Sequence, residues 1–121
     1  MSEKAKWVVN RDFWEPNRFR AFAKRHPKET GACLDNLEKV RGALSDHGQP
    51  GAFHFNFFRS EGGDIWRIGQ TNVGHACETR LYVYLYVKGA TVYVLTIGDK
   101  SQQRHDIQRC RELAKEIEKR C

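Results

Sequence analysis

The chain has 121 residues, of which 40% are apolar and 30% charged, so it predicts one globular domain over residues 1–121 and excludes a disordered chain. Its formal net charge of +6, from 21 Lys and Arg against 15 Asp and Glu, favours a polyanionic partner because binding would release counterions. No run approaches the ~20 apolar residues of a membrane span, and residues 1–6 lack the apolar core of a secretory signal, so we expect a cytoplasmic protein.

The first part of the chain predicts a short strand and then a helical hairpin. The strand covers residues 6–10, and Asn17 is a suitable cap for a first helix that ends before Pro27. Thr30 is a suitable cap for a longer second helix, which should end at Gly48 because glycine adopts the left-handed conformation without strain. The second helix has one apolar face with helical spacing: Cys33, Leu34, Leu37, Val40 and Leu44.

The rest of the chain predicts strands and a final helix. An alternation of period two begins at Ala52, and residues 61–64 should turn the chain. Three more strands are expected, at residues 65–70, 80–87 and 91–97, and the short segment 88–90 should join the last two as a hairpin. A closing amphipathic helix has an apolar stripe of Ile107, Cys110, Ala114, Ile117 and Cys121. The fold class is therefore α+β, with an N-terminal strand and helical hairpin packed on a mainly antiparallel sheet of four to five strands, and a C-terminal helix.

The strand over residues 80–87 has two different faces, because alternate side chains point to opposite sides. One side is aliphatic and should meet the helices, and the other side carries Arg80, Tyr82, Tyr84 and Tyr86. We expect this second side to be open or partly covered and to bind RNA, because its guanidinium can pair with phosphate and its phenol rings can stack on unpaired bases. The alternative is that the tyrosines are ordinary cross-strand packing and Arg80 is a solvated end residue.

Four other basic side chains are candidates for a site at the end of the sheet. Arg67 lies in mid-strand opposite an apolar face, and Lys100, Arg104 and His105 follow the last strand. A cluster of permanent cations with one imidazole is the minimum for metal-free cleavage of a phosphodiester, in which cations stabilise phosphoryl charge and an acid protonates the leaving oxygen. The alternative is that the last three residues only solvate the start of the final helix.

We expect no metal or other cofactor. The four cysteines are scattered, and neither they nor the histidines have the regular spacing of a zinc site. Free thiols are the simplest interpretation for a protein in a reducing compartment.

Several segments together resemble a known family. They are Asp64-Ile65-Trp66-Arg67, the strand from Arg80 to Tyr84, the run from Val92 to Ser101, and Asp106-Ile107 with the helix that follows. With the helical hairpin, they are similar over roughly residues 17–119 to the RelE/HigB-type toxins of bacterial type II toxin-antitoxin modules, in the RelE/ParE superfamily.

The resemblance implies a RelE-like fold, metal-free cleavage of messenger RNA at the ribosome, and neutralisation by a cognate antitoxin protein from a neighbouring gene. It implies that Arg67, Arg80 and Lys100 contact phosphate and stabilise the transition state. Arg104 and His105 have no fixed counterpart in the family; we expect Arg104 to bind RNA and His105 to act as the general acid.

The sequence also departs from the family pattern. The segment 52–59 is unusually aromatic, the loop 71–79 is long, and no terminal tyrosine or histidine follows the last strand. These departures leave open a non-catalytic alternative, either a ParE-like toxin directed at gyrase or a domain that binds RNA or protein without cleavage.

Overall fold

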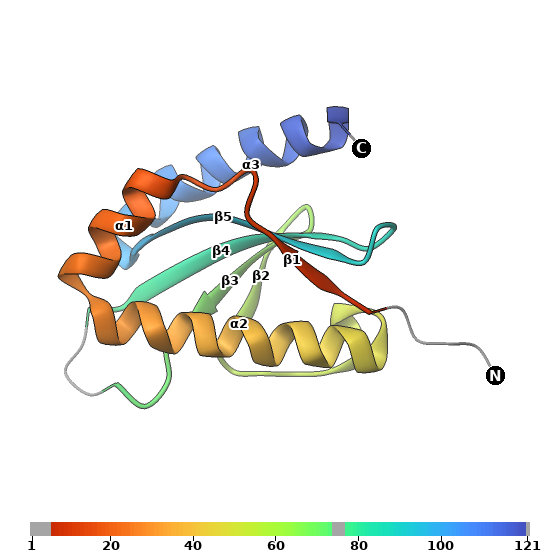
Figure 1. Cartoon of the computed structure of the whole chain (residues 1–121), viewed down its shortest axis with the longest axis horizontal. Helices are drawn as coiled ribbons and strands as arrows, with labels where there is room; N and C mark the ends of the chain where they lie inside the picture. Colours follow the sequence, from red (N-terminus) through yellow and green to blue (C-terminus); the bar gives the residue numbers. More distant parts are fainter. Residues whose placement is uncertain (1–5, 74–76, 121) are drawn as a thin grey trace.

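The computed structural model describes residues 6–73 and 77–120, which form an α+β fold with a five-stranded mixed sheet (Figure 1). The elements are, in chain order, β1 (Val8–Asn10), α1 (Pro16–Arg25), α2 (Pro27–His47), a 3₁₀ turn (Pro50–Ala52), β2 (Phe58–Gly62), β3 (Ile65–Gly69), β4 (Thr79–Tyr86), β5 (Thr91–Asp99), a second 3₁₀ turn (Lys100–Gln102) and α3 (Gln103–Arg120). The strand order is β1-β5-β4-β3-β2, with β1 parallel to β5 and the other pairs antiparallel. None of these helices has the length and apolar character needed to cross a bilayer.

Helices cover the sheet on both faces. Figure 1 shows α2 along one face and α3 along the other, so the sheet is the middle layer. The α1–α2 side holds a core that includes Phe19, Phe22, Leu37, Val40, Leu44, Leu81, Val83 and Leu85. The α3 side holds a second core that includes Ile65, Tyr82, Tyr84, Leu95, Cys110, Leu113 and Ile117. The central strands β4 and β5 are therefore apolar on both faces, as strands between two helical layers must be.

Both helices of the hairpin begin earlier than the capping residues predict. α1 starts at Pro16 and α2 at Pro27, so the predictions of caps at Asn17 and Thr30 are wrong. Proline is favoured at the first helical position because its fixed φ suits the helix and its missing N–H would have no partner there. The predicted end of α2 is confirmed, since Gly48 has φ of 83° in the left-handed region.

The aromatic segment before β2 is not a strand. The chain makes a 3₁₀ turn at Pro50–Ala52 and a further turn in which the Phe58 N–H donates to the Phe55 carbonyl, so regular pairing begins only at Phe58. The phenylalanine rings instead stack and pack on the α2 side of the core, with ring centroids 4.8 Å apart for Phe55 and Phe57. The alternation in this segment reflects aromatic packing rather than a ladder of hydrogen bonds.

The tyrosine face of β4 is closed, which corrects the expectation of an open stacking surface. Tyr82 and Tyr84 are 0% and 4% exposed because the apolar stripe of α3 packs directly over them. Tyr86 is half-buried at the far end of β4, with its ring centroid 6.4 Å from that of Tyr93. The bulk of this tyrosine set is core, as the alternative interpretation of the sequence held.

A matched pair of substitutions tests the environment of the two buried hydroxyls. The Tyr84 hydroxyl donates to Glu118 Oε1 at 2.7 Å, whereas the Tyr82 hydroxyl is buried without a partner among the described residues. We expect Tyr84→Phe to lower the free energy of unfolding by about 1 kcal/mol and Tyr82→Phe to raise it by about 1 kcal/mol, because an unsatisfied buried hydroxyl is costly. Urea denaturation measures both. A loss of stability in Tyr82→Phe would mean that this hydroxyl has a partner in solution.

Candidate nucleic-acid interface

One part of the sheet's α3 face is left uncovered by the helix and forms a groove. α3 packs on β4, β5 and Ile65 at one end of β3, and the other end of β3 together with β2 carries polar side chains. The groove has a volume of about 450 Å³. We call it the arginine groove because three arginines line it: Arg59, Arg67 and Arg80. Phe57, Gly69 and Glu78 also line it.

Strand register places the three arginines on the same face. Arg59 on β2 lies opposite Arg67 on β3, and Arg67 lies opposite Tyr82, two residues along β4 from Arg80. Arg80 has glycine on both sides, Gly69 on β3 and Gly98 on β5. Like charges directly opposite each other destabilise a sheet. This part of the sheet is therefore strongly positive, and a negative group bound there would offset the repulsion between Arg59 and Arg67.

The two central arginines are largely buried and retain free donors. The side chains of Arg67 and Arg80 are 23% and 14% exposed. Within the described parts of the chain, neither Nε has a hydrogen-bond partner. A buried donor without an acceptor costs roughly 1–3 kcal/mol, and more when it is charged. An oxyanion in the groove would offset the charge of both arginines and can accept hydrogen bonds from their Nη groups in the fork geometry that guanidinium groups prefer.

Two carboxylates partly neutralise these cations. Glu61 Oε1 lies 3.2 Å from Arg67 Nη1, so Arg67 has an internal partner at the turn end of the groove. Glu78 lies between two cations, with Oε1 3.4 Å from Arg80 Nη2 and Oε2 3.6 Å from Lys100 Nζ. The contacts of Glu78 are long and its side chain is exposed, so they are weak contacts that a phosphate can displace.

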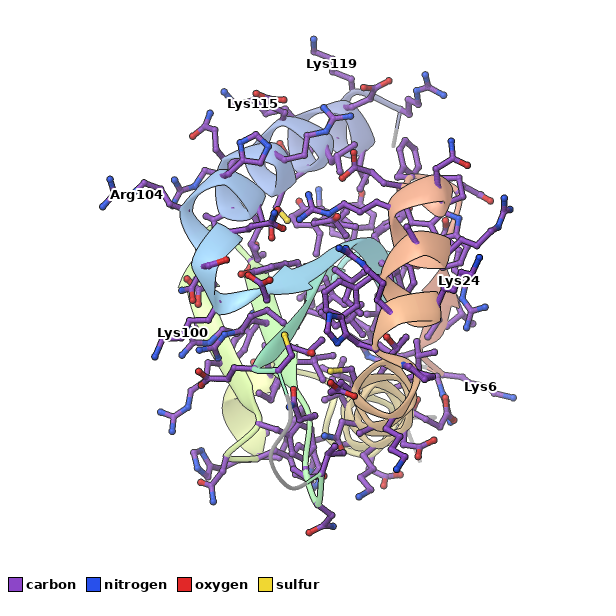
Figure 2. The ribbon with its side chains drawn as sticks, turned by 90° about the vertical axis from the view of Figure 1, so that its left-hand side faces the viewer. Lys6, Lys24, Lys100, Arg104, Lys115 and Lys119 are labelled. Carbon is purple, nitrogen blue, oxygen red and sulfur yellow. The ribbon has the colours of Figure 1, made fainter. Side chains whose placement is uncertain are left out.

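A second hollow lies beside the N-terminal end of α3. It measures about 1030 Å³ and is lined by Lys100, Arg104, His105, Gln108 and Arg111, among others. Figure 2 shows Lys100 and Arg104 on the same side of the molecule, and Lys24 of α1 on the opposite side. Because Lys100 lines this hollow and also contacts Glu78 of the arginine groove, the two hollows are neighbours. We call the second one the α3 hollow.

The candidate residues from the sequence lie in two neighbouring hollows and not in one site. Arg67 and Arg80 share the arginine groove, and Lys100 is joined to it through Glu78. Arg104 and His105 lie in the α3 hollow, beside the groove rather than in it. The sequence reasoning missed Arg59 and Glu78, which lie on the groove wall.

The chemistry of the groove is that of an anion site. In the described ranges no cluster of three or more His, Cys, Asp or Glu side chains is arranged to hold a metal ion.

Cys33 and Cys110 are buried and, like Cys77, form no disulfide. Burial raises the pKa of Cys33 to about 12, so its thiol is protonated at neutral pH and is a poor nucleophile. Among the described residues that line the groove, the charged side chains are those of three arginines and Glu78.

The chain was compared with protein-family models, with curated proteins and with solved structures, and none of them matches it.

Proposed function

We propose that this chain is the toxin of a toxin-antitoxin module and acts as a metal-free endonuclease on messenger RNA at the ribosome. The observation that carries the proposal is the convergence of Arg67 and Arg80 in one groove, with their Nε donors lacking partners among the described residues. A phosphodiester offers acceptors of the right charge and spacing for two such guanidinium groups.

The shape of the site favours an RNA strand over a small anion. The arginine groove and the neighbouring α3 hollow together present cations from β2, β3, β4 and α3 along one side of the molecule. A small anion needs only one or two of these cations, whereas successive phosphates of a strand can use them all. Single strands are the form of RNA whose backbone can follow such a path.

The wider assignment rests on the family resemblance of the sequence. The order of elements agrees with it, because a strand and helical hairpin precede the sheet and a C-terminal helix follows. In the proposed reaction, Arg67 and Arg80 stabilise charge on the phosphoryl oxygens, Lys100 adds a third cation, and His105 protonates the leaving 5′ oxygen. A cognate antitoxin would neutralise this activity in the cell.

Induced expression is expected to arrest growth within a few generations and to produce RNA fragments with 5′-hydroxyl and 2′,3′-cyclic phosphate ends. Lys100→Ala should reduce the cleavage rate by about 10-fold to 100-fold, since one transition-state cation is lost. The measurement is growth after induction together with mapping of RNA ends. Lys115→Ala on the outer part of α3, which Figure 2 shows away from Lys100, is the matched control and should remain toxic.

Growth arrest without RNA cleavage would point to the non-catalytic alternative, such as a gyrase-directed toxin. Normal growth at high expression of the wild-type chain would contradict both kinds of toxin and leave a domain that binds RNA or protein without cleavage.

A further inference from the structure

We propose that Glu78 is the general base of the reaction, taking the proton from the ribose 2′-hydroxyl that attacks the phosphorus. This inference rests on the proposed endonuclease function and assigns a role that neither the sequence pattern nor the resemblance supplies. It follows from where Glu78 lies between the two hollows, and from the contacts of the other carboxylates nearby.

Glu78 is the acidic side chain on the wall of the arginine groove. Its two carboxylate oxygens face different cations, Arg80 on one side and Lys100 on the other. A scissile phosphate held by Arg80 and Lys100 would therefore lie next to this carboxylate. A general base must be within hydrogen-bond reach of the proton it takes, and a phosphate held by the two cations that flank Glu78 would bring its ribose to this carboxylate.

The Glu78 side chain is also exposed, and its contacts with the neighbouring cations are weak. Its side chain is 59% exposed, and its contacts with Arg80 and Lys100 are 3.4 and 3.6 Å long. When phosphate oxygens take over these two cations, the carboxylate is released with its lone pairs available. The same two cations therefore hold the base in place before binding and hold the phosphate after it.

The neighbouring carboxylates are committed to other contacts. Asp99 accepts hydrogen bonds from Ser101, which lower its pKa, and thereby caps the turn that leads into α3. Asp106 is fully buried against Arg18. Glu61 is mostly buried and pairs with Arg67. Glu78 is the accessible carboxylate of this region among the residues the structure describes.

The step balances without any further reactant. The Glu78 carboxylate takes the 2′-hydroxyl proton as the 2′ oxygen forms a bond to phosphorus, and the bond from phosphorus to the 5′ oxygen breaks. The leaving 5′ oxygen receives a proton from the His105 imidazolium on the α3 side. The products are a 2′,3′-cyclic phosphate and a 5′-hydroxyl, and the proton on Glu78 returns to water and then to His105.

The test compares RNA cleavage with RNA binding in Glu78→Gln, a change that keeps side-chain size and removes the base. Cleavage of a short messenger RNA loaded on ribosomes, by the full chain under single-turnover conditions, should fall by about 100-fold to 10,000-fold. Binding of the same RNA with 2′-O-methyl riboses, which cannot react, should be unchanged or tighter because a competing negative charge is gone. Glu78→Asp should recover part of the rate, and added formate should partly restore cleavage by Glu78→Ala.

The matched control is Glu38→Gln on α2, where the glutamate is 63% exposed and also pairs with an arginine. It should cleave and bind as the wild type does. Cleavage by Glu78→Gln at the wild-type rate would overturn the inference while leaving the endonuclease proposal intact. Parallel loss of binding and cleavage, with no recovery by formate, would also overturn it, because Glu78 would then only support the groove. If the wild-type chain binds RNA but does not cleave it, the endonuclease proposal fails first and the role of Glu78 fails with it.

Discussion

Replacing Arg67 and Arg80 together by alanine is expected to weaken binding of single-stranded RNA at least about 100-fold, since each charge-assisted hydrogen bond contributes roughly 1.5–3 kcal/mol. The two side chains are mostly buried in the arginine groove, where water screens their charge less than at the surface. The measurement is fluorescence anisotropy with an uncleavable 2′-O-methyl RNA at about 0.1 M salt, because this affinity depends steeply on ionic strength.

The control must remove the same charge from another place. Arg20→Ala with Lys24→Ala lowers the net charge equally, and both residues are exposed on α1, the helix that Figure 2 shows on the side of the molecule away from Lys100. This control should bind RNA within a factor of about two to three of the wild type, since only long-range attraction changes. Salt titration separates the cases further, because loss of two phosphate contacts should reduce the slope of log K against log salt by about 1.4. Equal weakening in both double variants would show that RNA responds to overall charge and not to the groove.

The sequence predicts a basic site near the end of the sheet but not its full membership, because register cannot be read from alternation. Residues 61–64 do turn the chain as predicted, with Gly62, Gly63 and Asp64 all at positive φ. A simple hairpin with Gly62 opposite Ile65 would place Ser60 opposite Arg67. The bulge between Ser60 and Gly62 shifts the pairing by one residue and places Arg59 there instead. One bulge therefore brings a third arginine into the groove.

The expectation of an open tyrosine face was wrong for a related reason. The alternation in β4 correctly separates Leu81, Val83 and Leu85 from the tyrosines. Alternation does not show which element covers the second face of the strand. Three tyrosines are compatible with a solvent-exposed surface and also with a buried layer, because each ring is apolar and each hydroxyl is polar. The stripe on α3 was the available signal, because an amphipathic helix must bury its apolar side on some layer of the fold. With α1 and α2 already on one face, the tyrosine face was the remaining place for it.

The elements that local chemistry determines were predicted well. The strands β3, β4 and β5, the turn between the last two and the end of α2 at Gly48 agree with the structure within a few residues. The stripe of α3 agrees from Ile107 to Ile117, and its last predicted member, Cys121, lies outside the described residues. The position of Glu78 could not be predicted, because it follows a long loop and owes its role to two partners, one on β4 and one after β5. Contacts of this kind come from the assembled sheet and not from the pattern of one segment.

A buried ion pair beside the site joins α1 to the start of α3. Arg18 Nη2 lies 2.7 Å from Asp106 Oδ1, and the Asp106 side chain is fully buried. Burial raises the pKa of Asp106 above its ordinary value, and the Arg18 guanidinium only partly offsets this effect. Between the unfolded pKa and the raised one, the folded chain binds a proton at Asp106 that the unfolded chain has released, so the contribution of this group to stability falls as pH rises through that window. Asp106→Asn should remove this pH dependence.

Gly98 on β5 leaves the space that this ion pair occupies. A Cβ atom at Gly98 would overlap the Asp106 carboxylate and lie 2.8 Å from Arg18 Nη2. We expect Gly98→Ala to lower the free energy of unfolding by about 2 to 3 kcal/mol, because the pair must separate or α3 must move. Asp106→Ala alone should cost about 2 kcal/mol, less than the roughly 3 to 5 kcal/mol of a fully buried pair, since the Arg18 side chain is 28% exposed and can still reach water. Urea denaturation of each variant gives both values.

The double variant Gly98→Ala with Asp106→Ala shows whether the clash with the Asp106 carboxylate causes the loss of stability in Gly98→Ala. If it does, Gly98→Ala adds little once Asp106 is alanine, because the new methyl group fills the space that the carboxylate has left. The two changes should then be non-additive by about 2 kcal/mol, well above the few tenths expected for independent sites. Simple addition of the two costs would mean that Gly98 is needed for the conformation of β5 itself. The position of α3, and with it the relation of the α3 hollow to the arginine groove, would then not depend on this contact.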